Sequence, residues 1–472
     1  MLLRRLVADA ASVSSVNVLR LLAQVFVVPV LARVLSPTDY GLVGMSMPFI
    51  TLGMILADAG VGMSLIRTPA SQRRAWSTCF WLVVALGTAI TALLACVAPL
   101  AVLLLGEPRL RPMVMTLACV VLAQALATVP GAMLQQQCRF KAIAIIEITA
   151  VLLGIATAVV MAFRGAAAWA LIGQQLAYVG VKLVLTWLCA PFWPLWTCDV
   201  REVKEQLVFG GHLLGVNLVS FFTRSLDNLV IGTVLGAAAV GVYSMTFQFA
   251  RLPMMIVTGP LISVLYPRLI EIQADIDTLR RILLSGSRVL AIFMFPVIGL
   301  VAASHSPVFS LLLSDKWSMS GRLFLLVAPA CALQAVTALC GTVRMALGRT
   351  DIQLKVTVEF GILWLTALLT GVTFGLEWLT LAYTALVLIY GPRSLMLVLP
   401  LIDCPLRTYL RILAAPALVT LICVSAFAVF NHLVSLSPWG QLCVAAVLAA
   451  LAIVVNALAQ TPLFARSSEY RM

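Results

Sequence analysis

The chain has 472 residues, of which 62% are hydrophobic and only 10% are charged, with a mean hydropathy of +1.09 and a formal net charge of +13. Soluble domains carry about 25% charged residues, so this composition excludes an ordinary soluble protein. Apolar runs of about twenty residues, the length of a helix that crosses a bilayer, recur from end to end. The sequence contains no C-x-x-C, no H-E-x-x-H and no Cys/His cluster, so it supports neither a metal site nor another cofactor.

Hydropathy predicts an all-α integral membrane protein with about fourteen transmembrane helices. The predicted spans, in chain order, are 12–33, 41–66, 77–104, 113–134, 142–163, 167–190, 207–232, 239–266, 287–313, 322–347, 355–376, 378–400, 409–430 and 438–460. The connections between them are short, and none is long enough to fold as a separate domain.

The distribution of Lys and Arg gives an independent test of these spans, because basic residues collect on the cytoplasmic side of membrane proteins. With a cytoplasmic N-terminus, the even-numbered connections and both tails carry eighteen basic residues, and the opposite side carries five. An error of one span would scramble this alternation. The sequence therefore predicts a multi-pass protein with both termini in the cytoplasm. Its positive charge reflects topology and attraction to anionic lipid, and nucleic acid is not an expected partner.

The longest connections include residues 191–206, PFWPLWTCDVREVKEQ. Tryptophans followed by charged residues favour a helix that lies on the membrane surface. Because this linker falls between the sixth and seventh spans, it marks a boundary between halves. We therefore predict a six-helix lobe at 1–190, a cytoplasmic linker at 191–206, a second six-helix lobe at 207–400, and two additional transmembrane helices with a C-terminal tail at 401–472.

An internal repeat supports that boundary. Shifting the sequence by 200 places the first two spans on the seventh and eighth, and the identical pairs include Asn17/Asn217, Gly41/Gly241 and Met45/Met245. The register has no gap across two helices and the turn between them. Six spans separate the copies, so both copies cross the membrane in the same direction. The sequence predicts a parallel repeat, related by an axis along the membrane normal.

Polar residues interrupt the first helix of each repeat at helical spacing. Asn217, Ser220, Arg224 and Asp227 follow one face of the seventh span, and Asn17, Arg20 and Gln24 follow the matching face of the first. A charged residue at the centre of a membrane helix costs roughly 2.5–3.5 kcal/mol and usually faces a bundle interior or a water-filled cavity. We therefore expect the two polar faces to line a central cavity.

Other charged residues lie at depths from which they could join this cavity: Asp58, Glu147, Lys182, Arg251 and Glu359. Basic residues outnumber acids near the middle of the spans, and such a cavity suits an anionic group, since Arg binds phosphate oxygens through two parallel hydrogen bonds.

Structural interpretations of the same residues stay open. Arg224 and Asp227 can form an ion pair within the helix, and Asn17 and Asn217 can serve helix packing. Glu147 and Glu359 lie close to the inner interface as ordinary boundary residues would, and a role for Lys182 is equally open. Further arginines are expected to extend toward lipid headgroups and have no assigned role: Arg33, Arg344 and Arg393.

Four segments resemble those of bacterial polysaccharide flippases. They are VLARVLSPTDYGLVGM at 30–45, LADAGVGMSLIR at 56–67, RSLDNLVIGTVLGAAAVGVYSMTFQFARLP at 224–253 and VLYPRL at 264–269. These oligosaccharide-lipid flippases belong to the superfamily that also contains the multidrug and toxin extrusion transporters. The matches cover roughly residues 10–70 and 205–270, and the rest of the chain agrees in the number of spans more than in its residues.

The resemblance implies a transporter, not an enzyme, in the bacterial inner membrane. Its substrate would be an oligosaccharide repeat unit linked to undecaprenyl diphosphate, used for exopolysaccharide, capsule or O-antigen synthesis. Membrane lipid, a polysaccharide polymerase and export machinery would be its other partners. Carried over by position, Arg20, Arg224 and Arg251 would hold the diphosphate-sugar head, and Asp58 and Asp227 would orient them or respond to a coupling ion. The sequence does not choose between H⁺ and Na⁺, or show that either is needed.

Three other functions compete with this one. An organic-cation antiporter of the same superfamily would need acids to dominate the cavity. A flippase for peptidoglycan precursors is close in chemistry. A membrane polysaccharide polymerase usually needs a sizeable outward loop, whereas the outward connections here have about ten residues or fewer.

Overall fold

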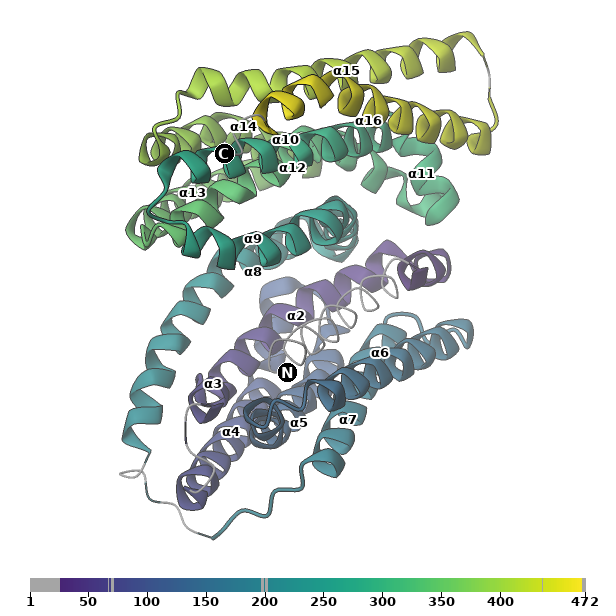
Figure 1. Cartoon of the computed structure of the whole chain (residues 1–472). Coiled ribbons are helices and arrows are strands. Elements are labelled where there is room, and N and C mark those ends of the chain that lie inside the picture. The colour runs from purple at the N-terminus through teal and green to yellow at the C-terminus, as the bar shows by residue number, and fades with distance from the viewer. Residues whose placement is uncertain are drawn as a thin grey trace. The chain divides into compact units, whose positions relative to one another are not determined.

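The structure is a computed structural model that describes residues 26–66, 68, 72–196, 199, 203–434 and 436–468, without the side chains of 223, 224, 263, 267 and 459–468. Every regular element in this part of the chain is a helix (Figure 1). This agrees with the sequence, because a backbone that crosses a bilayer must satisfy its own hydrogen bonds. Contacts divide the chain into two compact units, Met1–Ser244 (unit 1) and Met245–Met472 (unit 2).

Unit 1 begins, in its described part, with a helical stretch at 26–34. Six complete helices follow and then the first part of a seventh: α2 (Pro37–Asp58), α3 (Val61–Ile66), α4 (Arg73–Leu105), α5 (Leu110–Gln136), α6 (Phe140–Phe163), α7 (Trp169–Cys189) and α8 (Lys204–Pro253). A capping box starts α2, since Asp39 N–H donates to Ser36 Oγ at 3.3 Å and Ser36 N–H donates to Asp39 Oδ2 at 2.9 Å. Residues 30–45, which carried part of the family resemblance, therefore contain a well-defined helix start.

Unit 2 continues α8 from Met245. It contains η1 (Met254–Thr258), α9 (Gly259–Glu271), α10 (Ile276–Ala303), α11 (His305–Leu312), η2 (Asp315–Trp317), α12 (Ser318–Ala346), α13 (Thr350–Gly371), η3 (Val372–Phe374), α14 (Leu376–Val398), η4 (Leu399–Ile402), α15 (Leu406–Leu433) and α16 (Pro438–Ser468). Its largest buried cluster joins α10, α12 and α14 around Tyr409 of α15.

Twelve helical stretches of the described chain are long and apolar enough to cross a membrane. One of them, Lys204–Glu271, is 68 residues long and contains two predicted spans, 207–232 and 239–266. Gly236, with φ 82°, interrupts the helix between these two spans. The first predicted span, 12–33, lies mostly outside the described residues. The predicted all-α membrane fold is confirmed.

The linker is described in part. Residues 191–196 and 199 are not helical, whereas 204–206 belong to the start of α8. Arg73 Nη2 donates to the carbonyl of Trp193 at 3.3 Å, Trp81 Nε1 donates to that of Leu195 at 2.9 Å, and the Trp81 and Trp196 rings stack at 4.8 Å. Contacts with α4 hold these residues. The charged part of the linker falls largely outside the described residues, so the expected surface helix stays a prediction. The predicted lobe boundaries themselves stay a prediction.

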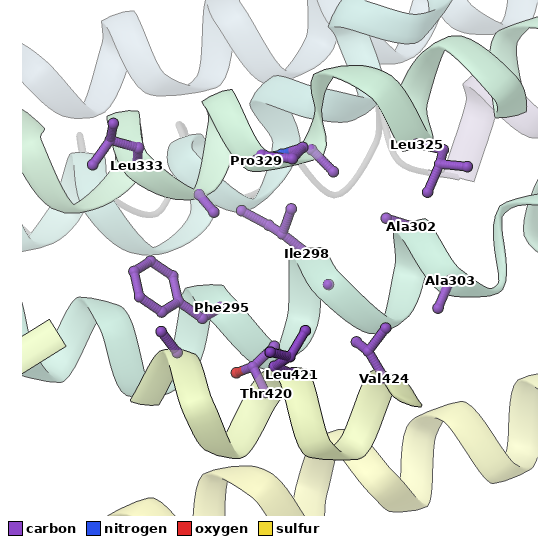
Figure 2. Close-up of a pocket in the computed structure, with 14 residues that line it drawn as sticks. Phe295, Ile298, Ala302, Ala303, Leu325, Pro329, Leu333, Thr420, Leu421 and Val424 are labelled. Atoms are coloured by element: carbon purple, nitrogen blue, oxygen red, sulfur yellow. The ribbon is translucent and has the colours of Figure 1, made fainter. Parts of the chain in front are cut away.

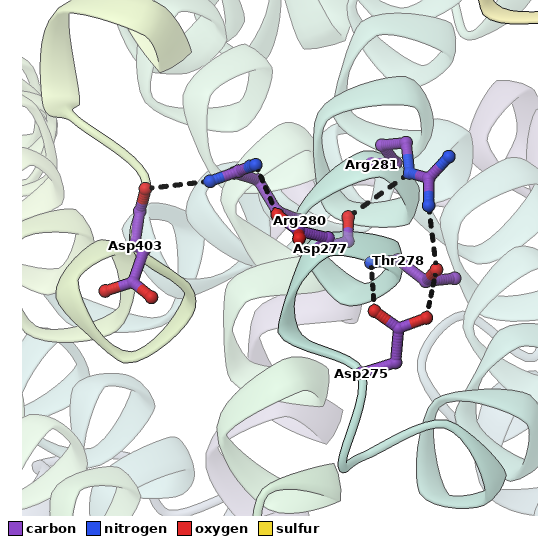
Figure 3. Close-up of polar contacts among 6 residues, drawn as sticks. All are labelled: Asp275, Asp277, Thr278, Arg280, Arg281 and Asp403. Atoms are coloured by element: carbon purple, nitrogen blue, oxygen red, sulfur yellow. Dashed lines mark hydrogen bonds and ion pairs between the residues drawn. The ribbon is translucent and has the colours of Figure 1, made fainter. Parts of the chain in front are cut away.

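The segment before α10 is held by side chains outside the spans (Figure 3). Asp275 caps the helix by accepting hydrogen bonds from the N–H and the hydroxyl of Thr278, at 3.0 and 2.6 Å, and these bonds hold the pKa of the Asp275 carboxyl below its usual value. Arg280 donates to Asp277 at 2.5 Å and to the carbonyl of Asp403 at 3.2 Å. The contact with Asp403 ties the start of α10 to the connection that precedes α15.

Candidate functional site

The residues predicted for a central cavity are distributed over both units. Asn17, Arg20 and Gln24 lie outside the described residues. Asn217 is half-buried on the first part of α8, in unit 1. Arg224 lies on the same helix, and its side chain is also outside the described part. Arg251 is exposed and belongs to unit 2, so the joint site of Arg224 and Arg251 stays a prediction.

Asp227 has well-defined partners within unit 1. Its Oδ2 accepts from the hydroxyl of Tyr243 at 3.0 Å, and its Oδ1 accepts from the N–H of Asn228 at 2.9 Å. Residues sixteen apart on a straight helix would be separated by about 24 Å. The Asp227–Tyr243 bond therefore shows that the chain folds back at Gly236, between the predicted spans 207–232 and 239–266. Tyr243 is a partner of this carboxylate that the sequence did not reveal.

Asp58 lies at the end of α2 and bonds locally. Its Oδ2 accepts from the N–H of Gly60 at 3.2 Å, in a turn where Ala59 and Gly60 both have positive φ, 45° and 73°. The carboxylate is half-buried. This hydrogen bond helps to shape the turn between α2 and α3, and the predicted orienting or coupling role of Asp58 stays a prediction.

Glu147 of α6 joins two residues of α7, and we call these three residues the Glu147 cluster. Glu147 Oε1 contacts Lys182 Nζ at 2.5 Å, and Glu147 Oε2 accepts from Tyr178 OH at 2.8 Å. The side chains of Lys182 and Glu147 are only 26% and 19% exposed. The Lys182 charge is therefore compensated within unit 1, which differs from a free cation facing a cavity.

Glu359 of α13 forms an equivalent arrangement in unit 2, the Glu359 cluster. Its Oε1 and Oε2 accept from Nη2 and Nε of Arg393 on α14, both at 2.9 Å, and Oε2 also accepts from Tyr390 OH at 2.8 Å. Arg393, expected to extend alone toward headgroups, is instead bound to this carboxylate through two parallel hydrogen bonds.

The two clusters correspond in sequence as well as in geometry. Tyr178 follows Glu147 by 31 residues, and Tyr390 follows Glu359 by the same 31. In both clusters the acid lies on one helix and the tyrosine and cation lie on the next. The repeat therefore extends beyond the spans compared above, although its register has changed from 200 to 212. This shared spacing is the signal that could have identified Tyr178 and Tyr390.

Arg344 also departs from its expected position. Its side chain is 3% exposed, so it does not reach the headgroups. Its Nε donates to Gln353 Oε1 at 2.9 Å, and its Nη1 donates to the hydroxyl and carbonyl of Ser394 at 3.1 and 3.2 Å. A buried guanidinium needs such acceptors. Arg344 joins α12, α13 and α14 beside the Glu359 cluster.

Unit 2 also contains an apolar cavity of about 390 Å³ between α10, α12 and α15 (Figure 2). Thr420 is the only residue with a polar side chain in its lining, which includes Phe295, Ile298, Leu333 and Val424. Among the side chains that the structure describes, no predicted site residue lines it. A cavity of this composition does not suit a diphosphate or a sugar.

No group of three or more His, Cys, Asp or Glu side chains that could hold a metal ion occurs in the described part of the chain. Glu147 with Lys182 and Glu359 with Arg393 form ion pairs between neighbouring helices. Glu147, Glu359 and Asp227 each accept a hydrogen bond from a tyrosine.

Comparison with known proteins identifies the family. A model of the family described as polysaccharide biosynthesis protein matches residues 30–321, more than half of the chain. The chain belongs to this polysaccharide biosynthesis family. It is 28% identical to the lipopolysaccharide biosynthesis protein WzxC of Escherichia coli K12 over 72% of this chain and 70% of WzxC.

Two further relatives in biosynthesis of polysaccharides match over less than two thirds of their own length. The teichuronic acid biosynthesis protein TuaB of Bacillus subtilis 168 is 26% identical over 63% of this chain and 62% of TuaB. The succinoglycan biosynthesis transport protein ExoT of Rhizobium meliloti 1021 is 24% identical over 62% of this chain and 59% of ExoT.

Solved structures support the fold. The lipid II flippase MurJ in an inward closed conformation matches with a TM-score of 0.77 over 97% of this chain and all of that chain, at 11% identity. A multidrug resistance transporter of the MATE family, in an inward-facing conformation, matches with a TM-score of 0.58 over 80% of this chain and 95% of that chain, at 13% identity. The family match confirms the predicted family, and the solved structures confirm the predicted fold.

Proposed function

We propose that this member of the polysaccharide biosynthesis family is a flippase for undecaprenyl-diphosphate-linked oligosaccharide repeat units. It would move them across the bacterial inner membrane for exopolysaccharide, capsule or O-antigen synthesis, with both termini in the cytoplasm. Besides the lipid-linked oligosaccharide and membrane lipid, its partners would be a polysaccharide polymerase and export machinery.

The observation that carries this proposal is that ionised residues lie inside the membrane-spanning helices of both units. Glu147 and Lys182 occur in unit 1, and Glu359 and Arg393 in unit 2. Asp227 adds a carboxylate with one tyrosine partner on α8. Such residues are costly in a bilayer and typically mark a path for polar substrates or ions. A chain that only anchored an assembly would not need them.

Within the proposal, Arg20, Arg224 and Arg251 bind the diphosphate, because guanidinium groups match phosphate oxygens. The amide side chains of Asn17, Gln24 and Asn217 donate to and accept from sugar hydroxyls. Lys182 is already paired with Glu147, so we assign it to the Glu147 cluster and not to the phosphate.

Translocation would proceed by alternating access, with the lipid tail remaining in the bilayer. The acids assigned to orientation or to coupling with H⁺ or Na⁺ are Asp58, Asp227, Glu147 and Glu359. The described partners of Asp227 and Glu147 include tyrosine hydroxyls, which can follow a change in protonation of the carboxylate.

Arg224→Ala tests the proposal. Hydrogen bonds to charged groups contribute about 1.5–3 kcal/mol, so the variant should bind the diphosphate roughly 10- to 100-fold more weakly. Lipid-linked oligosaccharide should accumulate on the cytoplasmic face of the native host, and polymer should fall. The matched control is Arg164→Ala, which removes an exposed arginine at the end of α6. Normal polymer output from Arg224→Ala at equal protein level would contradict the assignment.

A second candidate is a flippase for peptidoglycan precursors, which the fold likeness to the lipid II flippase favours. Both substrates carry a polyprenyl diphosphate, so the cavity arginines would have the same role. Depletion of the protein distinguishes the two, since loss of polysaccharide with normal cell-wall synthesis supports the first and lysis supports the second.

A further inference from the structure

The two copies of the repeat touch each other through their backbones within unit 1. A Cβ atom placed on Gly41 of α2 would overlap the carbonyl oxygen of Ala237 and lie 2.5 Å from its carbonyl carbon. A Cβ atom placed on Gly241 would overlap the carbonyl oxygen of Pro37 and lie 3.0 Å from the backbone nitrogen of Gly41. We call this reciprocal approach the Gly41–Gly241 contact.

The contact follows the register of the repeat. A shift of 200 relates Gly41 to Gly241 and Pro37 to Ala237, so each glycine meets the residue that lies four positions before the glycine of the other copy. Gly44 and Ser244 are also related by 200, and a Cβ on Gly44 would lie 3.4 Å from Ser244 Oγ. Two segments that are related by a two-fold axis make reciprocal contacts of this kind between equivalent residues. The axis predicted from the sequence therefore passes through this contact.

A second backbone approach lies at the other end of α2. A Cβ on Gly60 would be 2.6 Å from the carbonyl oxygen of Gly210, and a Cβ on Gly210 would be 2.5 Å from that of Ala59. We call this the Gly60–Gly210 contact. Positive φ at Gly60, 73°, gives a second reason for glycine there. A Cβ on the neighbouring Gly211, in contrast, would have no other atom within 4 Å.

The two contacts are separated by about the thickness of a membrane. Gly41 is seventeen residues from Asp58, where α2 ends, which is about 26 Å of helix, and Gly60 follows in the next turn. A hydrocarbon core is about 30 Å thick. On α8, Asn217 and Asp227 lie between Gly210 and Ala237. The polar face assigned to the substrate is thus bounded at each membrane surface by a backbone contact.

We propose that these contacts are the two gates of the transport path. With both termini cytoplasmic, the Gly41–Gly241 contact closes the path on the outer side and the Gly60–Gly210 contact closes it on the inner side. Both bring backbone against backbone, so no side chain of the glycines is displaced when a contact separates. The side chains beside them, Val240 against Gly44 and Leu207 against the cluster that contains Val61, separate at the same time. This assignment rests on the proposed transport function, and it specifies which residues must separate in each half of the cycle.

Single methyl groups test the gates by wedging them open. In a cysteine-free background with Ser220→Cys as reporter, Gly241→Ala should increase labelling several-fold by a membrane-impermeant maleimide added outside intact cells. Gly210→Ala should increase labelling several-fold in inverted vesicles. Gly211→Ala, where a methyl group meets open space, should label as the parent does. Labelling by both wedge variants equal to that of Gly211→Ala would overturn the proposal.

A reversible crosslink tests the outer gate without a wedge. Gly44→Cys with Ser244→Cys places the two sulfurs within reach of a disulfide, given the 3.4 Å separation described above. Oxidation should stop export of lipid-linked oligosaccharide, and dithiothreitol should restore it. Unchanged export with the disulfide formed would show a permanent contact and overturn the gate. The reduced protein could fail to move oligosaccharide while labelling of the Ser220→Cys reporter still increases in Gly241→Ala and Gly210→Ala. In that case the proposed substrate is wrong and the assignment of the gates is retained.

Discussion

The Glu147 and Glu359 clusters share an acid and a tyrosine but differ in the cation. Lys182 offers one contact to Glu147, at 2.5 Å, and is 26% exposed, whereas Arg393 offers two parallel hydrogen bonds to Glu359 and is 52% exposed. A lysine ammonium can transfer its proton to a carboxylate in a low-dielectric setting, but an arginine guanidinium keeps its charge in proteins. The repeat therefore supplies the acid and the tyrosine twice, whereas the cations differ in register, since a shift of 212 places Lys182 on Ser394. The cation of unit 1 can give up its proton, and that of unit 2 cannot.

The largest expected effect comes from removing one charge of the Glu147 cluster. Lys182→Ala leaves Glu147 without its cation inside a span, and breaking such a pair costs about 3 kcal/mol, the lower end of the range for buried pairs. Thermal unfolding in detergent should show a clear fall in Tm. The double variant Glu147→Gln with Lys182→Met should lose less than the sum of the single variants. Additive losses would mean that the pair is not coupled.

Exchanging the two cations distinguishes an effect of their charge from an effect of proton transfer. Lys182→Arg should keep Tm close to that of the wild type, because the ion pair is retained, yet it should abolish any transport step that uses the lysine proton. Arg393→Lys should lower Tm modestly, because one of two hydrogen bonds to Glu359 is lost. Transport measured against pH in both variants checks the difference. Identical pH profiles for Lys182→Arg and the wild type would remove any role for the lysine proton.

The tyrosines should behave alike, since their geometry is the same in both clusters. Tyr178→Phe and Tyr390→Phe each remove one hydroxyl that donates to a carboxylate at 2.8 Å. Each should cost about 1 kcal/mol in the free energy of unfolding. Denaturation monitored by tryptophan fluorescence measures both. A large effect for one tyrosine and none for the other would contradict the equivalence of the clusters.

The smallest effect is expected for Asp275, a carboxylate outside the spans that provides a baseline for those within them. Its depressed pKa, caused by hydrogen bonds from Thr278, means that it stabilises the fold above its unfolded pKa of about 3.9 and loses that contribution as pH falls through the folded pKa. The Tm difference between wild type and Asp275→Ala should therefore be small and constant near pH 7 and shrink below about pH 4. A difference that grows on acidification would contradict this sign.

Much of the fold was predictable because a bilayer imposes strong local rules. Apolar runs at 77–104 and 113–134 became α4 and α5, with limits shifted by a few residues. Ser36, Pro37 and Asp39 started α2 as their local chemistry requires. The non-helical conformation of residues 191–196 was not predicted, because it depends on contacts with Arg73 and Trp81 of a distant helix.

The candidate site was less predictable. Asp227, Glu147, Lys182 and Glu359 stood out because a charge inside a span is costly, but nothing local identified their partners. Tyr243 reaches Asp227 only because the chain folds back at Gly236. Arg344 looked like a residue that reaches headgroups, yet it bonds to Ser394 on a helix fifty residues away.

By itself, the sequence determined the class of protein, the positions of the spans, the charge asymmetry of the connections and the register of the repeat. These properties depend on the free energy of each side chain in water or in lipid. That free energy follows from the residue type and its position in the sequence. Tertiary structure alone decided which cation neutralises Glu147 and Glu359, and it alone brought Gly41 against Ala237. Such pairings depend on how helices rotate and approach one another in three dimensions, which hydropathy and spacing do not encode.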